Sequence, residues 1–470
     1  MTSFAPNKKI IPWIVAGAFF MEVMDETIIG TAVPKIAHSL HVNPISLKAA
    51  IISYLISLAV LIPASGWFAE KFGTRRVLAV ALGIFTGASL LCGLSQTLHQ
   101  LILARVLQGF GGALMTPVGR IIMLRTFEKS ELVQAMNYVI IPSLLGSLSG
   151  PLLSGIIVTY FSWRWIFFIN IPAGILAVIM VLRLIPNYIS DDVAKFDVTG
   201  FVLLGFGLGG ASYAMEGFGQ HNLSLLTSGI LLLVCMLSVY ACYLYSRARK
   251  NPIIHFPVFK LLTFRMAFIA NFLMRVGISS ISFLLPLLYQ VSFGWLPVYS
   301  GLLMLPFMLG GAISKFFSHR TLKRFGMKRV LVVNSSLLGL SVMSFALVTA
   351  NMPVIFIILM SFINGCFTTM FFSSVNPTAY SELDKNITAK AISIYGTVQR
   401  VSFSFGIGIT AFLLEVFLKT PTLTHASNIS AYHLTFIIMG LITLLSIPLF
   451  MVLPHDVAEN VSGYKHRLPQ

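Results

Sequence analysis

Charged residues are scarce in this sequence. Asp, Glu, Lys and Arg make up 10% of its 470 residues, while apolar residues make up 57%; an ordinary soluble domain carries about 25% charged residues. The mean hydropathy is +0.88, and the stretches between the apolar runs are too short to bury an aqueous core. The composition excludes a soluble globular protein and predicts a membrane protein with many spans.

Cysteine and catalytic motifs are also rare or missing. The four cysteines lie inside apolar runs without the spacing of metal ligands or of a disulfide framework, so we expect them to be small packing residues. The sequence contains no Walker A motif, dinucleotide fingerprint, HExxH motif or nucleophile elbow. We therefore expect a protein that is not an enzyme, binds no metal or cofactor, and draws its energy from a proton gradient instead of ATP.

Apolar runs long enough to cross a bilayer, about 20 residues each, recur along the whole chain. We count fourteen. They are Ile11–Val33, Ala50–Ala69, Val77–Ser95, Leu101–Met123, Gln134–Val158, Trp165–Leu184, Val198–Met215, Leu225–Tyr245, Phe264–Tyr289, Val298–Phe317, Val330–Ala350, Pro353–Ser374, Ala391–Phe417 and Tyr432–Leu453.

The basic residues are distributed unevenly between the two sides of these runs. Of 32 Lys and Arg residues, 24 fall in the termini or in loops on the same side as the termini, four fall on the other side and four lie within runs. Positive residues accumulate in cytoplasmic loops, so we expect a multi-pass protein of the cytoplasmic (inner) membrane with both termini in the cytoplasm. This asymmetry also accounts for the net charge of +17 without a nucleic-acid partner.

A short polar stretch between two apolar runs occurs twice. Gly66 to Leu78 joins the second and third runs, and Arg324 to Leu331 joins the tenth and eleventh, 253 residues later. In both copies a glycine, Gly73 or Gly326, stands where a tight turn needs a positive φ. This long-period similarity predicts an internal repeat. We expect a six-helix bundle in residues 1–190, a two-helix insert in 191–260 and a second six-helix bundle in 261–470.

Three carboxylates lie in the middle of the first run. Glu22, Asp25 and Glu26 are three and four residues apart, which places them on one helical face. Carboxylates at that depth are costly and usually face a bundle interior or a water-filled cavity, where the neutral form is favoured. Asp25 and Glu22 are therefore candidates for a proton carrier. The alternative is that Asp25 only bonds a neighbouring helix and never changes its protonation.

Polar residues and glycines mark three further candidate sites. Arg105, within the fourth run, needs a buried partner, either a carboxylate of the first run or a backbone carbonyl. Glu70 beside the cationic cluster could form a charge latch, although a solvated cytoplasmic loop would also account for these charges. The three sets are the proton-coupling group Asp25, Glu22 and Arg105; the gating loop Gly66, Glu70, Gly73, Arg75 and Arg76; and the fifth-run hinge Gly146, Gly150, Pro151 and Gly155.

Isolated polar residues in other runs are candidates for a substrate cavity. In the second half, Arg275 and Arg400 could hold an anion, and Asn364 lies mid-run. The full set is Glu26, Gln108, Arg275, Asn364 and Arg400. The abundant Phe and Met side chains could line an adaptable pocket, or could equally face lipid.

Five stretches carry a resemblance to a known family. Gly66 to Arg76 resembles the loop motif of the major facilitator superfamily, Arg105 to Ala113 the helix-4 motif of its proton-coupled members, and Gly146 to Gly155 its helix-5 antiporter motif. Met24 to Ile29 with Pro34, and Phe196 to Gly200, resemble the fourteen-spanner drug:proton antiporters. The resemblance implies an all-α membrane protein with the major facilitator fold.

The chain departs from the family pattern at several positions. Glu70 stands where the family usually has Asp, Ser154 replaces a usual Gly, and Glu26 makes the first run more acidic than is typical. In the second loop copy Lys323 takes the place of Glu70, so that copy has no acidic partner for a latch.

The resemblance implies export of small organic or drug-like solutes in exchange for inward-moving protons, by alternating access. We expect the small-molecule substrate, protons and lipid to be the partners of a monomer. A dedicated siderophore, metal-chelate or metabolite exporter with the same fold is the alternative within transport. A non-transporting membrane sensor is the alternative outside it, although the retained carboxylates of the first run argue against it.

Overall fold

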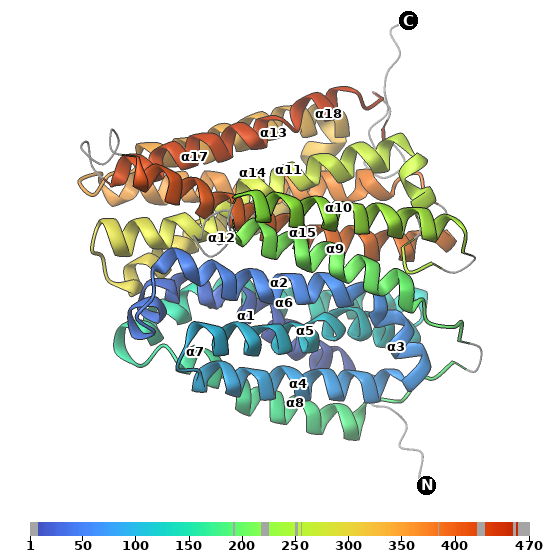
Figure 1. Ribbon diagram of the computed structural model, residues 1–470. Helices are drawn as coiled ribbons and strands as arrows, with labels where there is room; N and C mark the ends of the chain where they lie inside the picture. The colour runs from blue at the N-terminus through green and yellow to red at the C-terminus, as the bar shows by residue number, and fades with distance from the viewer. Residues whose placement is uncertain are drawn as a thin grey trace, which may run out of the picture. The chain divides into compact units, whose positions relative to one another are not determined.

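A computed structural model describes residues 8–190, 193–217, 225–249, 252–254, 256–383, 385–420, 428–454 and 457–458. All regular structure in these residues is helical (Figure 1). Contacts divide the chain into two compact units, 1–213 with 229–253 and 296–301, and 214–228 with 254–295 and 302–470. The sequence predicted two six-helix bundles and an insert on the basis of an internal repeat. Contacts within the chain do not test a repeat, so this division stays a prediction.

The first unit contains helices α1 to α8 and most of helices α9 and α10. They are α1 (Ile11–Ser39), η1 (Pro44–Leu47), α2 (Lys48–Leu61), η2 (Ile62–Ala64), α3 (Ser65–Phe72), α4 (Thr74–Leu94), α5 (Leu98–Thr126), α6 (Lys129–Tyr160), α7 (Trp165–Phe168), α8 (Asn170–Leu184), α9 (Val198–Gly217) and α10 (Leu225–Arg247).

The second unit contains most of the remaining helices. They are η3 (Phe256–Lys260), α11 (Leu262–Leu287), η4 (Leu288–Ser292), α12 (Pro297–Phe325), α13 (Met327–Ser344), η5 (Phe345–Leu347), α14 (Val354–Tyr380), α15 (Lys385–Lys419), α17 (Ile429–Leu444) and α18 (Ile447–Met451).

Each of the fourteen predicted runs falls on a helix or on a closely joined pair of helices. Twelve helices in the described residues are long and apolar enough to cross a membrane. The other two runs are α1, which carries Glu22, Asp25 and Glu26 in its middle, and α9, which is apolar over the shorter stretch Val198–Ala214. The predicted all-α membrane fold is confirmed.

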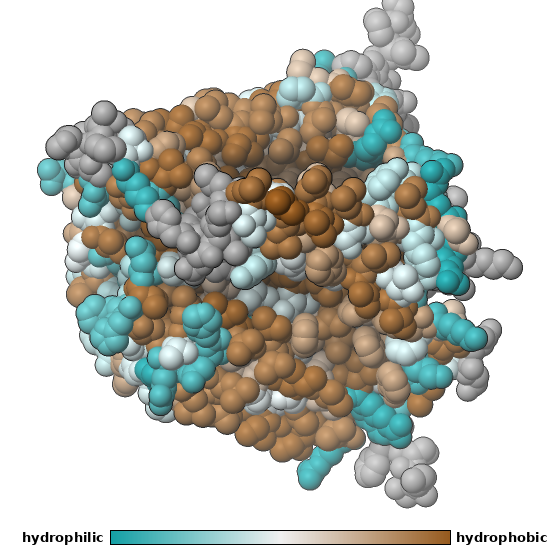
Figure 2. Space-filling model, in the orientation of Figure 1, coloured by the Kyte–Doolittle hydropathy of each residue, from teal (hydrophilic) through white to brown (hydrophobic). Residues whose placement is uncertain are grey.

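Hydrophobic side chains cover the visible middle of the helices, and hydrophilic side chains gather at the helix ends (Figure 2). Many of the large apolar residues are exposed, such as Leu103, Leu226 and Phe316. An apolar surface of this extent would aggregate in water, whereas in a bilayer it contacts lipid. The surface pattern therefore matches the composition.

The first unit is assembled around four helix pairs, in which α1 packs on α6, α5 packs on both α2 and α4, and α4 also packs on α8. The approach of α5 to α2 depends on Gly109. A Cβ added at this position would lie 2.7 Å from the carbonyl oxygen of Tyr54. Small residues permit such contacts between helices in a membrane, and this contact brings Arg105, one turn earlier on α5, against α2.

In the second unit α11 packs on α15 and α17, and α13 packs on α14 and α17. Its apolar core includes Phe264, Met274, Phe371 and Phe450, all fully buried. This unit therefore has the same kind of interior as the first, built from long helices around bulky apolar side chains.

The turns of the two loop copies have the predicted geometry. Gly73, between α3 and α4, has φ +90°, and Gly326, between α12 and α13, has φ +78°. A side chain at Gly73 would also collide with the carboxamide of Asn187. The expected positive φ is confirmed at both glycines.

We predict that Gly73→Ala destabilises the protein by about 1–3 kcal/mol, because an L side chain is strained at positive φ. The matched control is Gly66→Ala. An added Cβ at Gly66 has no heavy atom within 4 Å, and alanine is favoured over glycine inside a helix by about 0.5–1 kcal/mol. Thermal unfolding of the two purified variants measures the difference, and equal unfolding midpoints would contradict the turn assignment.

Candidate functional site

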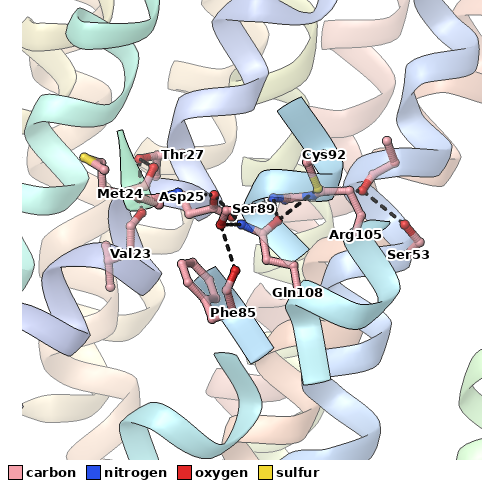
Figure 3. Close-up of polar contacts among 12 residues, drawn as sticks. Val23, Met24, Asp25, Thr27, Ser53, Phe85, Ser89, Cys92, Arg105 and Gln108 are labelled. Carbon is pink, nitrogen blue, oxygen red and sulfur yellow. Dashed lines mark hydrogen bonds and ion pairs between the residues drawn. The ribbon is translucent and has the colours of Figure 1, made fainter. Parts of the chain in front are cut away.

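Asp25 and Arg105 form an ion pair in the interior of the first unit. Asp25 lies in the middle of α1 and Arg105 near the start of α5, and both side chains are 0% exposed. Nη1 of Arg105 donates to Oδ2 of Asp25 at 2.6 Å (Figure 3). Two partners were considered for Arg105, a carboxylate of the first run or a backbone carbonyl, and the structure contains both, since Nε of Arg105 also donates to the carbonyl oxygen of Ala50.

The second carboxylate oxygen of Asp25 is also occupied. Its Oδ1 accepts hydrogen bonds from Nε2 of Gln108 at 2.8 Å and from Nδ2 of Asn170 at 3.0 Å. Gln108 lies one turn after Arg105 on α5, and Asn170 is the first residue of α8. Asp25 therefore accepts three hydrogen bonds from two helices other than its own, which stabilises its charged form.

Arg105 has further contacts with α2 and α7. Its Nε donates to the carbonyl oxygen of Ala50 at 3.4 Å, and its Nη1 also donates to Oε1 of Gln108 at 2.8 Å. The guanidinium carbon lies 4.1 Å from the ring centroid of Tyr54 and 5.9 Å from that of Phe167. These cation–π contacts stabilise the cation where water is absent.

Gln108 connects the ion pair to α4. Its Nε2 donates to Oγ of Ser89 at 2.8 Å, and its Oε1 accepts a long contact from Sγ of Cys92 at 3.6 Å. Ser89 in turn donates to the carbonyl oxygen of Phe85 at 2.8 Å. Side chains from α1, α4, α5 and α8 therefore converge on one polar network in an apolar bundle, and Figure 3 shows Asp25, Arg105 and Gln108 at its centre.

A buried ion pair of this kind is not explained by stability alone. Replacing a buried pair by apolar residues of similar volume is often neutral or stabilising, whereas removing only one partner costs about 3–5 kcal/mol. Ionisable residues inside membrane helices are by default functional. The network is therefore the candidate functional site of the first unit.

Glu22 and Glu26 lie outside this pair. Glu22 is 2% exposed, and its Oε2 accepts a hydrogen bond from the hydroxyl of Thr116 on α5. Glu26 is half-buried. The structure thus gives Glu22 and Asp25 different partners on α5.

The gating-loop residues are held mainly by backbone contacts. The N–H of Arg75 donates to Oδ1 of Asn187 at 3.1 Å, and the N–H of Thr74 donates to the carbonyl oxygen of Tyr188 at 3.1 Å. The carbonyl oxygen of Glu70 accepts from the N–H of Ser190 at 3.2 Å. The segment after α8 therefore fastens this loop, which the sequence reasoning missed because no motif marks Asn187.

The charged side chains of this loop lie near the surface. Glu70 and Arg76 are exposed and Arg75 is half-buried. In the described residues no ion pair joins Glu70 to Arg75 or Arg76. A charge latch at Glu70 stays a prediction.

The hinge residues lie on α6, and two of its glycines face α1. A Cβ added at Gly146 would lie 2.8 Å from the carbonyl oxygen of Phe20, and one added at Gly150 would collide with the side chain of Thr27. Gly155 packs closely on the backbone at Pro297, within the same unit. Pro151 lies within α6 and is buried.

The five tentative cavity residues belong to different units. In the first unit, Gln108 is part of the Asp25 network and Glu26 lies on α1; the other three lie in the second unit. There, the guanidinium carbon of Arg275 is 4.3 Å from the ring centroid of Phe372, Arg400 is half-buried, and Asn364 is fully buried. A common substrate cavity stays a prediction.

An amide–hydroxyl pair occurs at matching places in the two units. Nε2 of Gln108 on α5 donates to Ser89 on α4, and Nδ2 of Asn364 on α14 donates to Oγ of Ser341 on α13 at 3.0 Å. Asn364 follows Gln108 by 256 residues and Ser341 follows Ser89 by 252, close to the interval of the loop repeat. At the interval of 256 residues, Arg105 corresponds to Ser361, so the second unit repeats the amide contact without the arginine.

Two partners of the ion pair were not singled out by the sequence reasoning, Tyr54 and Asn170. Tyr54 looks like an ordinary aromatic residue of an apolar run. Asn170 is the lone polar side chain between Phe168 and Pro172, and a lone amide in a membrane-length run was a usable signal. The described residues contain no group of three or more His, Cys, Asp or Glu side chains that could hold a metal ion.

The features described above indicate a class of membrane protein. Long apolar helices, a repeated loop and a buried ion pair inside one helical unit are typical of a secondary transporter. The family model of the Major Facilitator Superfamily matches residues 15–407 and again residues 267–468. The chain belongs to the major facilitator superfamily.

Curated relatives and solved structures agree with this assignment. The chain is 35% identical over 98% of its length to the "Putative multidrug resistance protein MdtD" of Escherichia coli (strain SE11), covering 98% of that protein. The relative of the same name from Shigella boydii serotype 18 has the same identity and coverage.

Solved transporters share the fold at low sequence identity. The nucleoside transporter NupG has a TM-score of 0.66 at 16% identity, with 95% of this chain and 98% of that chain covered. A D-xylose–proton symporter has a TM-score of 0.68 at 14% identity, with 95% and 98% covered.

We predict that the Asp25–Arg105 pair is strongly coupled in stability. Asp25→Asn or Arg105→Gln alone leaves one buried charge without its counterion and costs about 3 kcal/mol or more. In the double variant no such charge remains, so its cost falls below the sum of the two. A double-mutant cycle on the unfolding free energy should give a coupling of about 2–3 kcal/mol; additive costs would show that the contact contributes nothing specific.

Proposed function

We propose that this protein is a proton-coupled secondary transporter that exports small organic or drug-like solutes across the cytoplasmic membrane by alternating access. The observation that carries the proposal is the fully buried Asp25–Arg105 pair with its amide partners. The name of the curated relatives favours drug-like solutes over metal chelates or metabolites. The proton gradient supplies the energy, with no cofactor and no chemical conversion of the substrate.

The ion pair provides a physical link between proton binding and helix packing. As an anion, Asp25 pairs with Arg105 and holds α1 against α5. A proton on Asp25 removes that charge and leaves a buried cation, whose remaining contacts are Gln108, the Ala50 carbonyl and two aromatic rings. Such a cation is costly in a low-dielectric interior. Protonation therefore favours any arrangement of α1, α2 and α5 that hydrates Arg105 or gives it another partner.

A transport cycle follows from this link. Opening to the outside hydrates the site, lets Asp25 take up a proton and releases a cationic or polar substrate. Opening to the inside releases the proton and restores substrate affinity. Glu22, bound to Thr116, is the second carboxylate at this depth and contributes to the charge that the substrate meets. A ligand shifts such an equilibrium only by its different affinity for the two states, and here the charge of Asp25 creates that difference.

We propose that the loop of Gly66, Glu70, Gly73, Arg75 and Arg76 acts as the gate and that Gly146, Gly150, Pro151 and Gly155 form the hinge on α6. The close contact of Gly146 and Gly150 with α1 supports the hinge, because a bend in α6 would move the helix that carries Asp25.

Arg75→Ala should slow conformational exchange and leave substrate affinity within a few-fold; an equal loss of both would contradict the gate.

Both termini are proposed to be cytoplasmic. Nζ of Lys8 lies 3.3 Å from Oε2 of Glu131, at the start of α6. The backbone N–H of Glu128 and the ammonium of Lys8 hold the pKa of Glu131 below its usual value. This contact supports the proposal, because Lys8 lies at the same end of the unit as Glu131 and the basic residue Arg125 that precedes it. A cysteine introduced at position 8 should react only from the cytoplasmic side, and labelling by an impermeant reagent in intact cells would overturn the topology.

We predict that Asp25→Asn abolishes pH-driven substrate accumulation in inverted membrane vesicles. The substitution preserves the shape of the side chain and removes both the site that takes up the proton and the charge that distinguishes the two states, so accumulation should no longer respond to pH. Glu22→Gln should reduce accumulation less, because Glu22 lies outside the ion pair.

Glu415→Gln is the matched control. Glu415 is a carboxylate of α15 whose Oε1 lies 2.7 Å from Nζ of Lys419 on the same helix. It is not part of the network, and accumulation should stay at the wild-type level. If Asp25→Asn accumulates substrate as well as this control, Asp25 does not carry the proton.

A further inference from the structure

Asn170 differs from the other amide that holds Asp25. Its side chain is fully buried, and Nδ2 donates to Oδ1 of Asp25 at 3.0 Å. In the described part of the chain, its own Oδ1 is buried and has no hydrogen-bond partner. A buried amide oxygen without a donor is costly, so its retention beside a titratable carboxylate calls for an explanation.

The side-chain amide of Gln108 has hydrogen-bond partners on both its nitrogen and its oxygen. Its Nε2 donates to both Asp25 and Ser89, and its Oε1 accepts from both Arg105 and Cys92. Turning this amide over would break contacts to four side chains. Gln108 is therefore a fixed donor to the carboxylate.

Turning the amide of Asn170 has a different cost. The torsion that orients it is broad and roughly two-fold. In the structure, Nδ2 of Asn170 donates to Asp25 and Oδ1 of Asn170 has no hydrogen-bond partner. After a turn of the amide, Oδ1 of Asn170 faces Asp25 and Nδ2 is the atom without a partner. The number of hydrogen bonds stays the same, provided that Asp25 then carries a hydrogen to donate.

We propose that Asn170 is a positioning residue for proton coupling, whose amide donates to the Asp25 carboxylate and turns to accept the hydrogen bond of the Asp25 carboxylic acid. This inference rests on the proposed function. A proton from water adds to Oδ1 of Asp25, and the new O–H donates to Oδ1 of Asn170. Oδ2 stays with Arg105, whose short charge-assisted bond disfavours a proton there.

The groups that act on this proton come from several helices. Arg105 of α5 faces Asp25 directly. The Tyr54 ring of α2 lies against the Arg105 guanidinium, Cys92 of α4 contacts Gln108, and Glu22 and Glu26 lie on α1 with Asp25. Of the two side-chain amides in hydrogen-bond contact with Asp25, only Asn170 has an atom free to accept a hydrogen bond. Oδ1 of Asn170 is therefore the acceptor available to the carboxylic acid form of Asp25.

The position of Asn170 follows from the break between α7 and α8. Phe167, near the end of α7, lies 5.9 Å from the Arg105 guanidinium, and Asn170 begins α8. Arg164 anchors this corner by donating from Nη2 to the carbonyl oxygen of Ser95 at 3.0 Å. One chain corner therefore supplies contacts to both members of the ion pair.

The test is the infrared difference spectrum of the purified protein between high and low pH. The wild type should show a carboxylic acid C=O band at the frequency of a hydrogen-bonded acid, and Asp25→Asn should lose it. In Asn170→Leu, a side chain of similar size without donor or acceptor, the band should move to a higher frequency, because the O–H of the acid loses its acceptor while Oδ2 keeps its bond to Arg105. Its pH midpoint should rise by about one unit, because the bond to the charged carboxylate is the stronger of the two bonds removed.

Two further variants make this result specific. Asn170→Thr restores a hydroxyl that both donates and accepts, and should return the band toward the wild-type frequency. Asn364→Leu removes a buried amide that binds Ser341 in the second unit, and should leave the Asp25 band unchanged. A wild-type band position in Asn170→Leu would overturn the role of Asn170.

A measurement on the wild type covers the case in which Asn170→Leu fails to fold. Isotope-labelled asparagine should give a shifted side-chain amide band in the same difference spectrum, because the amide changes from donor to acceptor. If the Asp25 acid band is present and no shifted amide band is seen, the role of Asn170 is overturned and the proposed proton coupling is not. If the wild type has no acid band that depends on Asp25, the proposed proton coupling fails, and this inference fails with it.

Discussion

The first unit depends on one constraint: a charge inside a membrane protein must have a counter-charge and hydrogen-bond partners. Asp25 on α1 satisfies it with Arg105 of α5, Gln108 of α5 and Asn170 of α8. Arg105 in turn needs the Ala50 carbonyl and the Tyr54 ring of α2. These polar contacts therefore help to fix how α1, α2, α5 and α8 pack on one another. The close approach at Gly109 is what lets α5 bring Arg105 near enough to α2.

This constraint also explains why the two units are chemically unequal. Both keep an amide–hydroxyl contact between corresponding helices, Gln108 with Ser89 and Asn364 with Ser341. In the first unit this amide also binds a carboxylate and an arginine, whereas in the second the residue 256 positions after Arg105 is Ser361. A neutral pair has little to gain from a change of pH. The proton-responsive element that we propose therefore belongs to the first unit.

Much of the fold was predictable because bilayer thickness fixes the length of apolar runs and positive φ restricts turn residues to glycine. The fourteen runs and the turns at Gly73 and Gly326 follow directly from those rules. A buried arginine also needs an acceptor, which limited the partner of Arg105 to a carboxylate of the first run or a backbone carbonyl, and the structure contains both contacts. Asn170 and Tyr54 were missed because their role depends on which helices become neighbours, and local sequence carries no such information. The side chain of Asn187 and the backbone of Tyr188 also bond the loop, which the sequence did not indicate. Those residues lie over 100 positions away in sequence, beyond the reach of a motif.

The central claim is that proton binding at Asp25 is exchanged for substrate. Substrate-induced proton release from the purified protein, followed with a pH-sensitive dye, measures this exchange without a membrane or a gradient. We predict that substrate releases protons from the wild type and that Asp25→Asn shows no substrate-induced proton release. Equal proton release from the wild type and from Asp25→Asn would contradict it.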